Sequence, residues 1–219
     1  MYQKILEQLR PTNTKLVAVS KTKPVEQIQE LYEQGQRIFG ESKAQELTDK
    51  YEALPKDIEW HMIGHLQRNK VKYIAPYISL IHSVDSPRLL KEINKQARKV
   101  DRVIDCLLQY HIADEESKYG FSKDTAEELL NSDVFAQMEH VRIVGVMGMA
   151  TFTDDQDQIR REFQYLHQIF DDLKANHFAD QESFCERSMG MSGDYQIAVE
   201  EGSTMVRIGT LLFGEREYA

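Results

Sequence analysis

Two lysines follow the first apolar run of the chain, where a buried strand is predicted to end. Residues 15–19 are mostly apolar, and Ser20, Lys21, Thr22 and Lys23 come directly after them. A lysine amine that is partly withdrawn from water has a lowered pKa and becomes nucleophilic toward an aldehyde. The sequence therefore predicts Schiff-base chemistry at Lys21 or Lys23. Strand alternation places both on the same side and does not choose between them, and two solvated surface lysines are the alternative.

A second group of residues, near the other end of the chain, suits an anion. It consists of glycines and hydroxyl side chains after the last two apolar runs: Ser188, Gly190, Ser192, Gly193, Gly209 and Thr210. Glycines let backbone N–H groups approach an anion, and a following helix would add its positive N-terminal end. These residues predict a phosphate site, and tight glycine turns are the alternative. The chain has neither GxxxxGK[ST] nor GxGxxG, so neither familiar nucleotide loop is supported.

A reactive lysine opposite a phosphate site makes a two-point site for a phosphorylated aldehyde, and pyridoxal 5′-phosphate (PLP) is the obvious candidate. Arg207, near the end of the last apolar run, would then donate to the pyridine nitrogen and disfavour its protonation; an ion pair is the alternative. An aldolase that acts on a sugar phosphate through Lys21 is a competing interpretation. His61 and His65 straddle a predicted strand end, so no metal site is expected.

The elements that must position these residues are short apolar runs alternating with amphipathic stretches. Strands are predicted at residues 15–19, 37–39, 58–63, 78–82, 103–110, 141–147, 183–187 and 205–208. Eight strands alternating with helices favour a parallel sheet closed into a (β/α)8 TIM barrel, whose active site lies at the carboxyl ends of the strands. Residues 37–39 are the weakest strand, and a seven-stranded open α/β sheet is the alternative. The 219 residues predict one domain, 1–219.

Composition narrows the class of protein. The chain has 27 Lys and Arg against 36 Asp and Glu, a formal charge of −9, and 41% hydrophobic residues. Such an acidic, apolar composition argues against disorder and against nucleic-acid binding. No apolar leader or run of membrane-spanning length is present, so no membrane association is expected. Cys106 and Cys185 lie in apolar runs and are expected to be buried and reduced, which predicts a cytoplasmic protein.

Several segments together closely resemble the YggS/PROSC family of PLP homeostasis proteins. They are residues 17–24 (VAVSKTKP), 39–41 (FGE), 60–64 (WHMIG), 116–121 (ESKYGF), 188–192 (SMGMS) and 206–210 (VRIGT). The resemblance covers nearly the whole chain. It implies the barrel of fold-type III PLP enzymes, similar to the N-terminal domain of alanine racemase. It also implies that Lys21 forms the Schiff base.

By position, the resemblance assigns Ser188, Gly190, Ser192, Gly209 and Thr210 to the cofactor phosphate and Arg207 to the pyridine nitrogen. Ser42 stands where the family commonly has asparagine, and residues 145–151, with Met149, follow the family pattern only loosely; no role is assigned to Ser42, His61 or Met149. Glu115, Glu116 and Lys118 belong to the loop after the fifth predicted strand; this loop could cover the barrel mouth, but a solvated loop is the favoured interpretation.

The resemblance also bears on catalysis. Racemases of this fold use a second base from an additional β domain, and this sequence stops at Ala219, soon after the eighth predicted strand. We therefore expect no catalytic residues and a reversible PLP-binding role in vitamin B6 homeostasis, with apo PLP enzymes as partners and a monomeric state. A slow amino-acid racemase is the alternative.

Overall fold

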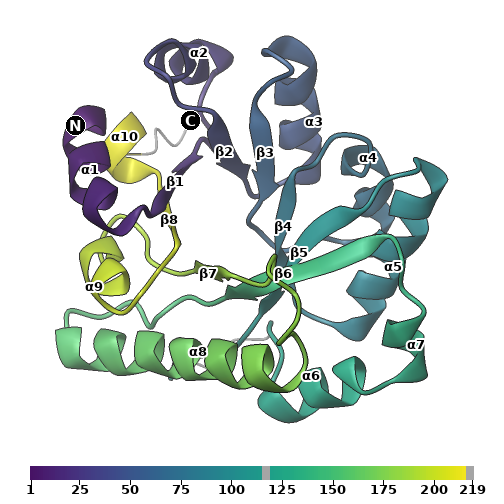
Figure 1. Ribbon diagram of the computed structural model, residues 1–219. Helices are drawn as coiled ribbons and strands as arrows, with labels where there is room; N and C mark the ends of the chain where they lie inside the picture. Colours follow the sequence, from purple (N-terminus) through teal and green to yellow (C-terminus); the bar gives the residue numbers. More distant parts are fainter. Residues whose placement is uncertain (115–118, 216–219) are drawn as a thin grey trace.

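Eight parallel strands close into a barrel in the computed structural model, which describes residues 1–114 and 119–215. The strands follow one another around the barrel in chain order, and β8 pairs with β1 (Figure 1). They are β1 Lys15–Val19, β2 Ile38–Glu41, β3 Glu59–Met62, β4 Leu80–Val84, β5 Ile104–Gln109, β6 Val141–Met147, β7 Glu186–Ser188 and β8 Met205–Ile208. The weakly predicted second strand exists, so the closed barrel is confirmed and the open sheet is wrong.

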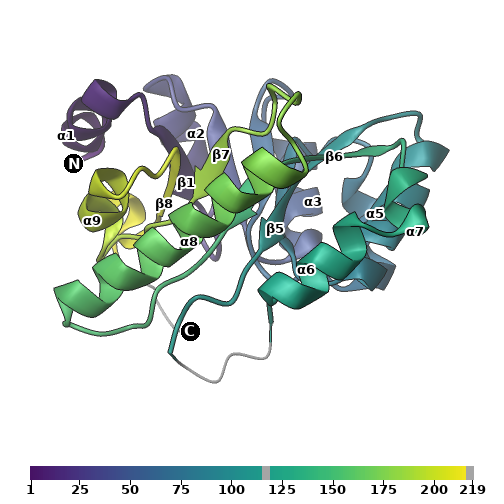
Figure 2. The ribbon, with the colours of Figure 1, turned by 60° about the horizontal axis from the view of Figure 1, so that its bottom comes forward.

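Helices surround the strands (Figures 1 and 2). They are α1 Tyr2–Leu9, α2 Val25–Glu33, α3 Ala44–Ala53, α4 Val71–Ile74, α5 Pro87–Lys99, α6 Lys123–Leu130, α7 Asp133–Ala136, α8 Gln156–Asn176, α9 Tyr195–Glu200 and α10 Thr210–Phe213, with 3-10 turns at Arg10–Thr12 and Arg68–Lys70. Helix α5 shows why they form: Pro87 occupies its first turn, and Leu89, Leu90 and Ile93 recur at helical spacing and are buried.

Strand alternation divides the buried side chains into two sets. One set packs between the strands and the surrounding helices, and it includes Phe39, Trp60 and Ile81. The other set fills the inside of the barrel, where Val17 and Leu107 belong to an apolar cluster. Because successive side chains of a strand point to opposite faces, every second residue of each strand faces the barrel interior. The interior is therefore a packed core whose polar members need partners.

The seventh strand differs from its prediction. Residues 183–187 were expected, whereas β7 spans Glu186–Ser188. Phe184 instead packs against the rings of Phe170 and Phe178, with centroids 4.9 and 4.3 Å away. The apolar run marks contact with α8 rather than a strand. Cys185 precedes β7 and is exposed, so the expectation of a buried thiol is wrong there and confirmed for Cys106.

Two sequence predictions concern the loops and the membrane. The loop residues Glu115, Glu116 and Lys118 lie outside the described residues, so neither the solvated loop nor the loop that covers the mouth is tested. Within residues 1–114 and 119–215, no helix combines the length and the apolar character needed to cross a membrane.

Candidate functional site

The carboxyl ends of β1, β7 and β8 form one continuous part of the barrel rim, because β8 pairs with both neighbours. The Gly209 N–H donates to Ser192 Oγ over 3.3 Å, which joins the segments after β7 and β8. On the other side, a Cβ added to Gly209 would lie 3.2 Å from the Val19 carbonyl oxygen at the end of β1. Lys21, two residues beyond Val19, therefore shares this part of the rim with the predicted phosphate residues.

A tight turn after β1 presents Lys21. The Lys23 N–H donates to the Ser20 carbonyl over 3.0 Å, and Thr22 has a φ of 64°. Positive φ is unusual for a β-branched residue, and such strained backbone persists only where its surroundings hold it. The Thr22 N–H donates to Glu46 Oε1 over 2.5 Å, which fixes the strained residue. Lys21 itself is half-buried.

A buried ionic network lies behind this turn. Lys50 Nζ, on α3, donates to the Ser20 carbonyl over 2.7 Å and to the carboxylates of Glu41 and Glu46, each over 2.8 Å. Ser20 Oγ donates to Glu41 Oε1 over 2.6 Å. Glu41 is fully buried, and burial raises the pKa of its carboxyl group. The sequence did not predict this network, because Glu46 and Lys50 also fit an ordinary i,i+4 surface pair.

Lys23, the alternative nucleophile, has a different environment. Its Nζ donates to the backbone carbonyls of Phe213 and Glu215, each over 2.9 Å. These carbonyls belong to the end of α10 and the residues after it. The Lys23 ammonium thus ties the turn after β1 to the segment after β8.

The segments after β7 and β8 carry glycines and hydrogen-bond donors of the kind that an anion site needs. Gly190 has a φ of 96°, and a Cβ there would lie 2.6 Å from Ala198 Cβ, so only glycine fits against α9. A Cβ at Gly193 would meet no atom within 4 Å. The backbone N–H groups of Ser192, Gly193 and Thr210 have no hydrogen-bond acceptor within the described part of the chain. Neutral N–H and hydroxyl donors around open space suit an oxyanion such as phosphate.

Arg207 and Ser188 lie inside the barrel, below this loop. Arg207 Nη1 donates to Ser188 Oγ over 2.6 Å and Nη2 donates to the Gly148 carbonyl over 3.1 Å. Burial lowers the pKa of Arg207 to about 10, so it remains charged at neutral pH. Ser188 is the last residue of β7 and fully buried, whereas the sequence placed it in the loop. The shorter, later strand is the reason for this difference.

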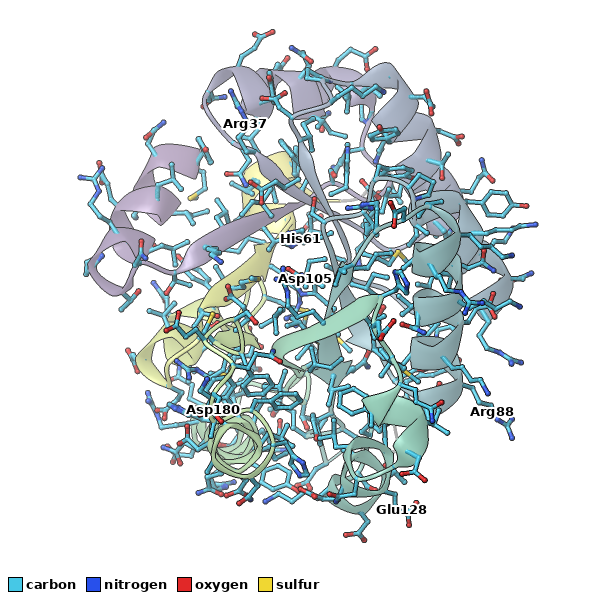
Figure 3. The ribbon with its side chains drawn as sticks, turned by 45° about the vertical axis from the view of Figure 1, so that its right-hand side comes forward. Arg37, His61, Arg88, Asp105, Glu128 and Asp180 are labelled. Atoms are coloured by element: carbon cyan, nitrogen blue, oxygen red, sulfur yellow. The ribbon has the colours of Figure 1, made fainter. Side chains whose placement is uncertain are left out.

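Two buried histidines continue this contact. His82 Nδ1 lies 2.8 Å from Ser188 Oγ, and His82 Nε2 lies 2.9 Å from His61 Nδ1. Figure 3 shows His61 near the centre of the molecule, whereas Arg88 and Glu128 project from its periphery. His65 points elsewhere and bonds to Asp85 over 3.0 Å, so His61 and His65 do not converge. The sequence singled out His61 but missed His82, whose polarity within an otherwise apolar strand was the available signal.

Ser42 and Met149 lie at the same end of the barrel. Ser42 is beside Gly64, where a Cβ would approach the Ser42 carbonyl to 2.6 Å, and it lines a cavity of about 320 Å³. The Met149 side chain is exposed on the rim. These observations assign no role to Ser42 or Met149.

Comparison with known proteins gives consistent matches. The alanine racemase N-terminal domain model matches residues 2–217. The chain is 41% identical over 205 residues to the PLP homeostasis protein of Aquifex aeolicus, covering 93% of this chain and 88% of that one. It is 38% identical over 217 residues to the human PLP homeostasis protein, covering 94% and 78%.

Solved structures agree in fold. PipY of Synechococcus elongatus PCC7942, with PLP bound, superposes with a TM-score of 0.84 at 32% identity, covering 96% of this chain and 99% of that one. Alanine racemase of Bartonella henselae, with covalently bound PLP, has a TM-score of 0.71 at 15% identity, covering 99% of this chain and 59% of that one. The second likeness concerns the barrel alone.

Proposed function

This chain belongs to the family of PLP homeostasis proteins, whose barrel is that of the alanine racemase N-terminal domain, and we propose that it binds PLP reversibly as a cytoplasmic store of the cofactor. In this proposal, apo PLP enzymes are the partners that receive the cofactor, and the chain itself performs no turnover. When bound, PLP supplies an electrophilic aldehyde and an electron-poor ring.

The observation that carries the proposal is the meeting of β1, β7 and β8 on one part of the rim. It brings a lysine that follows one strand next to a set of neutral anion donors that follow the other two. We assign the phosphate to the backbone and hydroxyl groups of Gly190, Ser192, Gly209 and Thr210. Local N–H groups suffice for this, because a field at short range outweighs a net charge of −9 spread over the surface.

Lys21 is proposed to hold the cofactor as a Schiff base. It follows the last residue of β1 by two positions and is half-buried at the part of the rim that carries the predicted anion donors. Lys23 is the weaker candidate, because its ammonium already donates to two backbone carbonyls. The bonds of Glu46 and Lys50 hold the strained turn, and thereby the direction of the Lys21 side chain.

Arg207 is proposed to donate to the ring nitrogen of the cofactor. A guanidinium that stays charged disfavours protonation of that nitrogen, and an unprotonated ring withdraws electrons less strongly. This supports binding without turnover. Ser188 was assigned to the phosphate from the sequence, but its Oγ bonds to Arg207 and His82. We therefore propose that Ser188 serves the cofactor through Arg207.

The decisive experiment is the visible absorption spectrum of the purified protein with PLP, compared with Lys21→Ala and Lys23→Ala. We expect the Schiff-base band in the natural protein and in Lys23→Ala, and its loss in Lys21→Ala while the circular dichroism spectrum stays unchanged. A band that survives in Lys21→Ala and disappears in Lys23→Ala would reverse the assignment.

The absence of turnover is tested separately, by deuterium exchange at Cα of a panel of amino acids. Exchange that depends on Lys21 would overturn the non-enzymatic part of the proposal and favour a slow racemase, while leaving PLP binding intact.

A further inference from the structure

The interior of the barrel contains a continuous chain of four polar side chains. Arg207 bonds to Ser188 over 2.6 Å, Ser188 to His82 over 2.8 Å, and His82 to His61 over 2.9 Å. Their exposed fractions are 4%, 0%, 0% and 3% in the same order. Burying a polar group costs free energy unless the group is hydrogen-bonded, and these four side chains bond to one another. Packing alone does not explain four polar side chains in the core.

Chemistry fixes the direction in which the protons of this chain point. Arg207 can only donate, so Ser188 Oγ accepts from it. The Ser188 hydroxyl proton then needs an acceptor, and His82 Nδ1 is the one that the described residues offer. His82 Nδ1 is therefore unprotonated, and its ring carries its proton on Nε2. That proton is donated to His61 Nδ1, so His61 also carries its proton on Nε2.

The protonation state of the rings agrees with this direction. Burial lowers the pKa of His61 to about 3 and lowers that of His82 well below its usual value, with the Arg207 charge adding to the effect on His82. Both rings are neutral at pH 7 and hold one proton each. A second proton on His61, at Nδ1, would put two N–H donors against each other, and a second proton on His82, at Nδ1, would face the Ser188 hydroxyl proton.

The far end of the chain reaches the opposite mouth of the barrel. His61 lines a cavity of about 550 Å³ that is bordered by the first residues of several strands, among them Lys15, Glu59 and Glu186. His61 lines this cavity, and its Nε2 makes no hydrogen bond to the described residues. The four side chains thus connect the cofactor end of the barrel with the amino-terminal mouth.

We propose that Ser188, His82 and His61 are positioning residues that set the orientation of Arg207 through this one-directional relay. A hydroxyl that donates to His82 is a better acceptor for Arg207, because hydrogen bonds in a chain polarise one another. Together with the Gly148 carbonyl, it fixes two corners of the planar guanidinium, so the remaining donors keep one direction. The benefit for the cofactor ring rests on the proposed PLP binding; the relay itself does not.

The direction of the relay is tested first, in cofactor-free protein, by ¹⁵N NMR of the histidine side chains. We expect the rings of His61 and His82 to carry their proton on Nε2. A proton on Nδ1 of either ring rejects the relay, whatever the protein binds.

The positioning role is tested by the affinity for PLP in three variants. His82→Leu removes the acceptor of Ser188 and should weaken binding roughly 10-fold, the effect of one unsatisfied buried hydrogen bond. His82→Gln keeps a carbonyl acceptor and an N–H donor, and should restore most of the affinity. Ser203→Ala is the matched control, since Ser203 is also buried and bonds to Met189 and Met205 carbonyls without contacting Arg207.

A cofactor analogue separates positioning from general loosening of the barrel. In the deaza analogue of PLP a C–H replaces the ring nitrogen, so Arg207 has no acceptor there. The 10-fold effect of His82→Leu should disappear with this analogue. An equal loss with PLP and with the analogue would reject the positioning role, whereas absence of PLP binding in the natural protein would reject the proposed function and leave the NMR test standing.

Discussion

Single residues inside the barrel carry most of the unusual chemistry of this protein. His61 and His82 are neutral because burial lowers their pKa values, and Arg207 stays charged because its pKa, lowered by burial to about 10, still lies above neutral pH. Of the relay residues, the sequence assigned roles to Arg207 and Ser188, and it noted His61 without a role. It could not predict that they touch, because the bonded pairs are 19, 21 and 106 positions apart and alternation specifies only the face of the strand.

The buried histidines predict a pH dependence of stability. Their pKa values are lower in the folded than in the unfolded protein, so below pH 6.5 the unfolded chain binds protons that the folded chain refuses. Each histidine should therefore lower the free energy of unfolding by about 1.4 kcal/mol per pH unit as the pH falls from 6.5 toward the folded pKa. Urea unfolding at several pH values between 7 and 5 measures this slope.

His82→Gln is the matched comparison for that measurement, because it removes one titrating ring. Its slope should be shallower than that of the natural protein by one histidine. Glu41, whose raised pKa acts in the opposite sense, is present in both proteins and cancels from the difference. Parallel curves would contradict the assignment of a neutral His82.

At the scale of elements, hydrophobic periodicity predicted the barrel because every strand carries buried residues on at least one face. It misplaced the start of β7, because Phe184 is not a strand residue but packs against Phe170 on α8. The buried ionic network between α3 and the turn after β1 could not be predicted either. Lys50 looks like a solvated surface residue in the sequence, and only the fold places it beside Glu41. The apolar character of a residue indicates that it is buried, but it does not indicate which residue it packs against.

The loop between β7 and α9 offers a paired test of the anion site. Gly190→Ala should lower the free energy of unfolding by about 2–4 kcal/mol and weaken PLP binding, because φ is positive there and the new Cβ would strike α9. Gly193→Ala should change stability by less than about 0.5 kcal/mol, because its Cβ meets open space. Thermal unfolding and PLP titration check both, and equal destabilisation by the two changes would contradict the described loop.

At the scale of the whole molecule, closure of the barrel is what creates the site. The predicted nucleophile and the predicted anion donors come from strands that are neighbours only because β8 pairs with β1. The sequence predicted that these two groups lie together because eight predicted strands indicate a closed barrel. Seven strands would have indicated an open sheet. An open sheet would leave the two groups at opposite edges.

Cofactor binding should accordingly stabilise the whole barrel. PLP at 100 times its dissociation constant should add about 2.7 kcal/mol, a rise in Tm of roughly 5–10 °C for a chain of this size. Pyridoxal, which lacks the phosphate, should raise the Tm much less at the same concentration, because the donors around Ser192 and Gly209 then have no anion to bind. Differential scanning calorimetry makes the comparison, and equal shifts would argue against the phosphate assignment.

The pairing of β1 with β8 also sets an order of events during synthesis. A ribosome releases Lys21 early, but the residues beside which it must lie, in β8 and the following turn, emerge only after the other seven strands. A nascent chain that contains only the first seven strands has the lysine without the anion donors of Gly209 and Thr210. Under the proposed PLP binding, acquisition of the cofactor should coincide with closure of the barrel, and a bound chromophore should report a closed barrel.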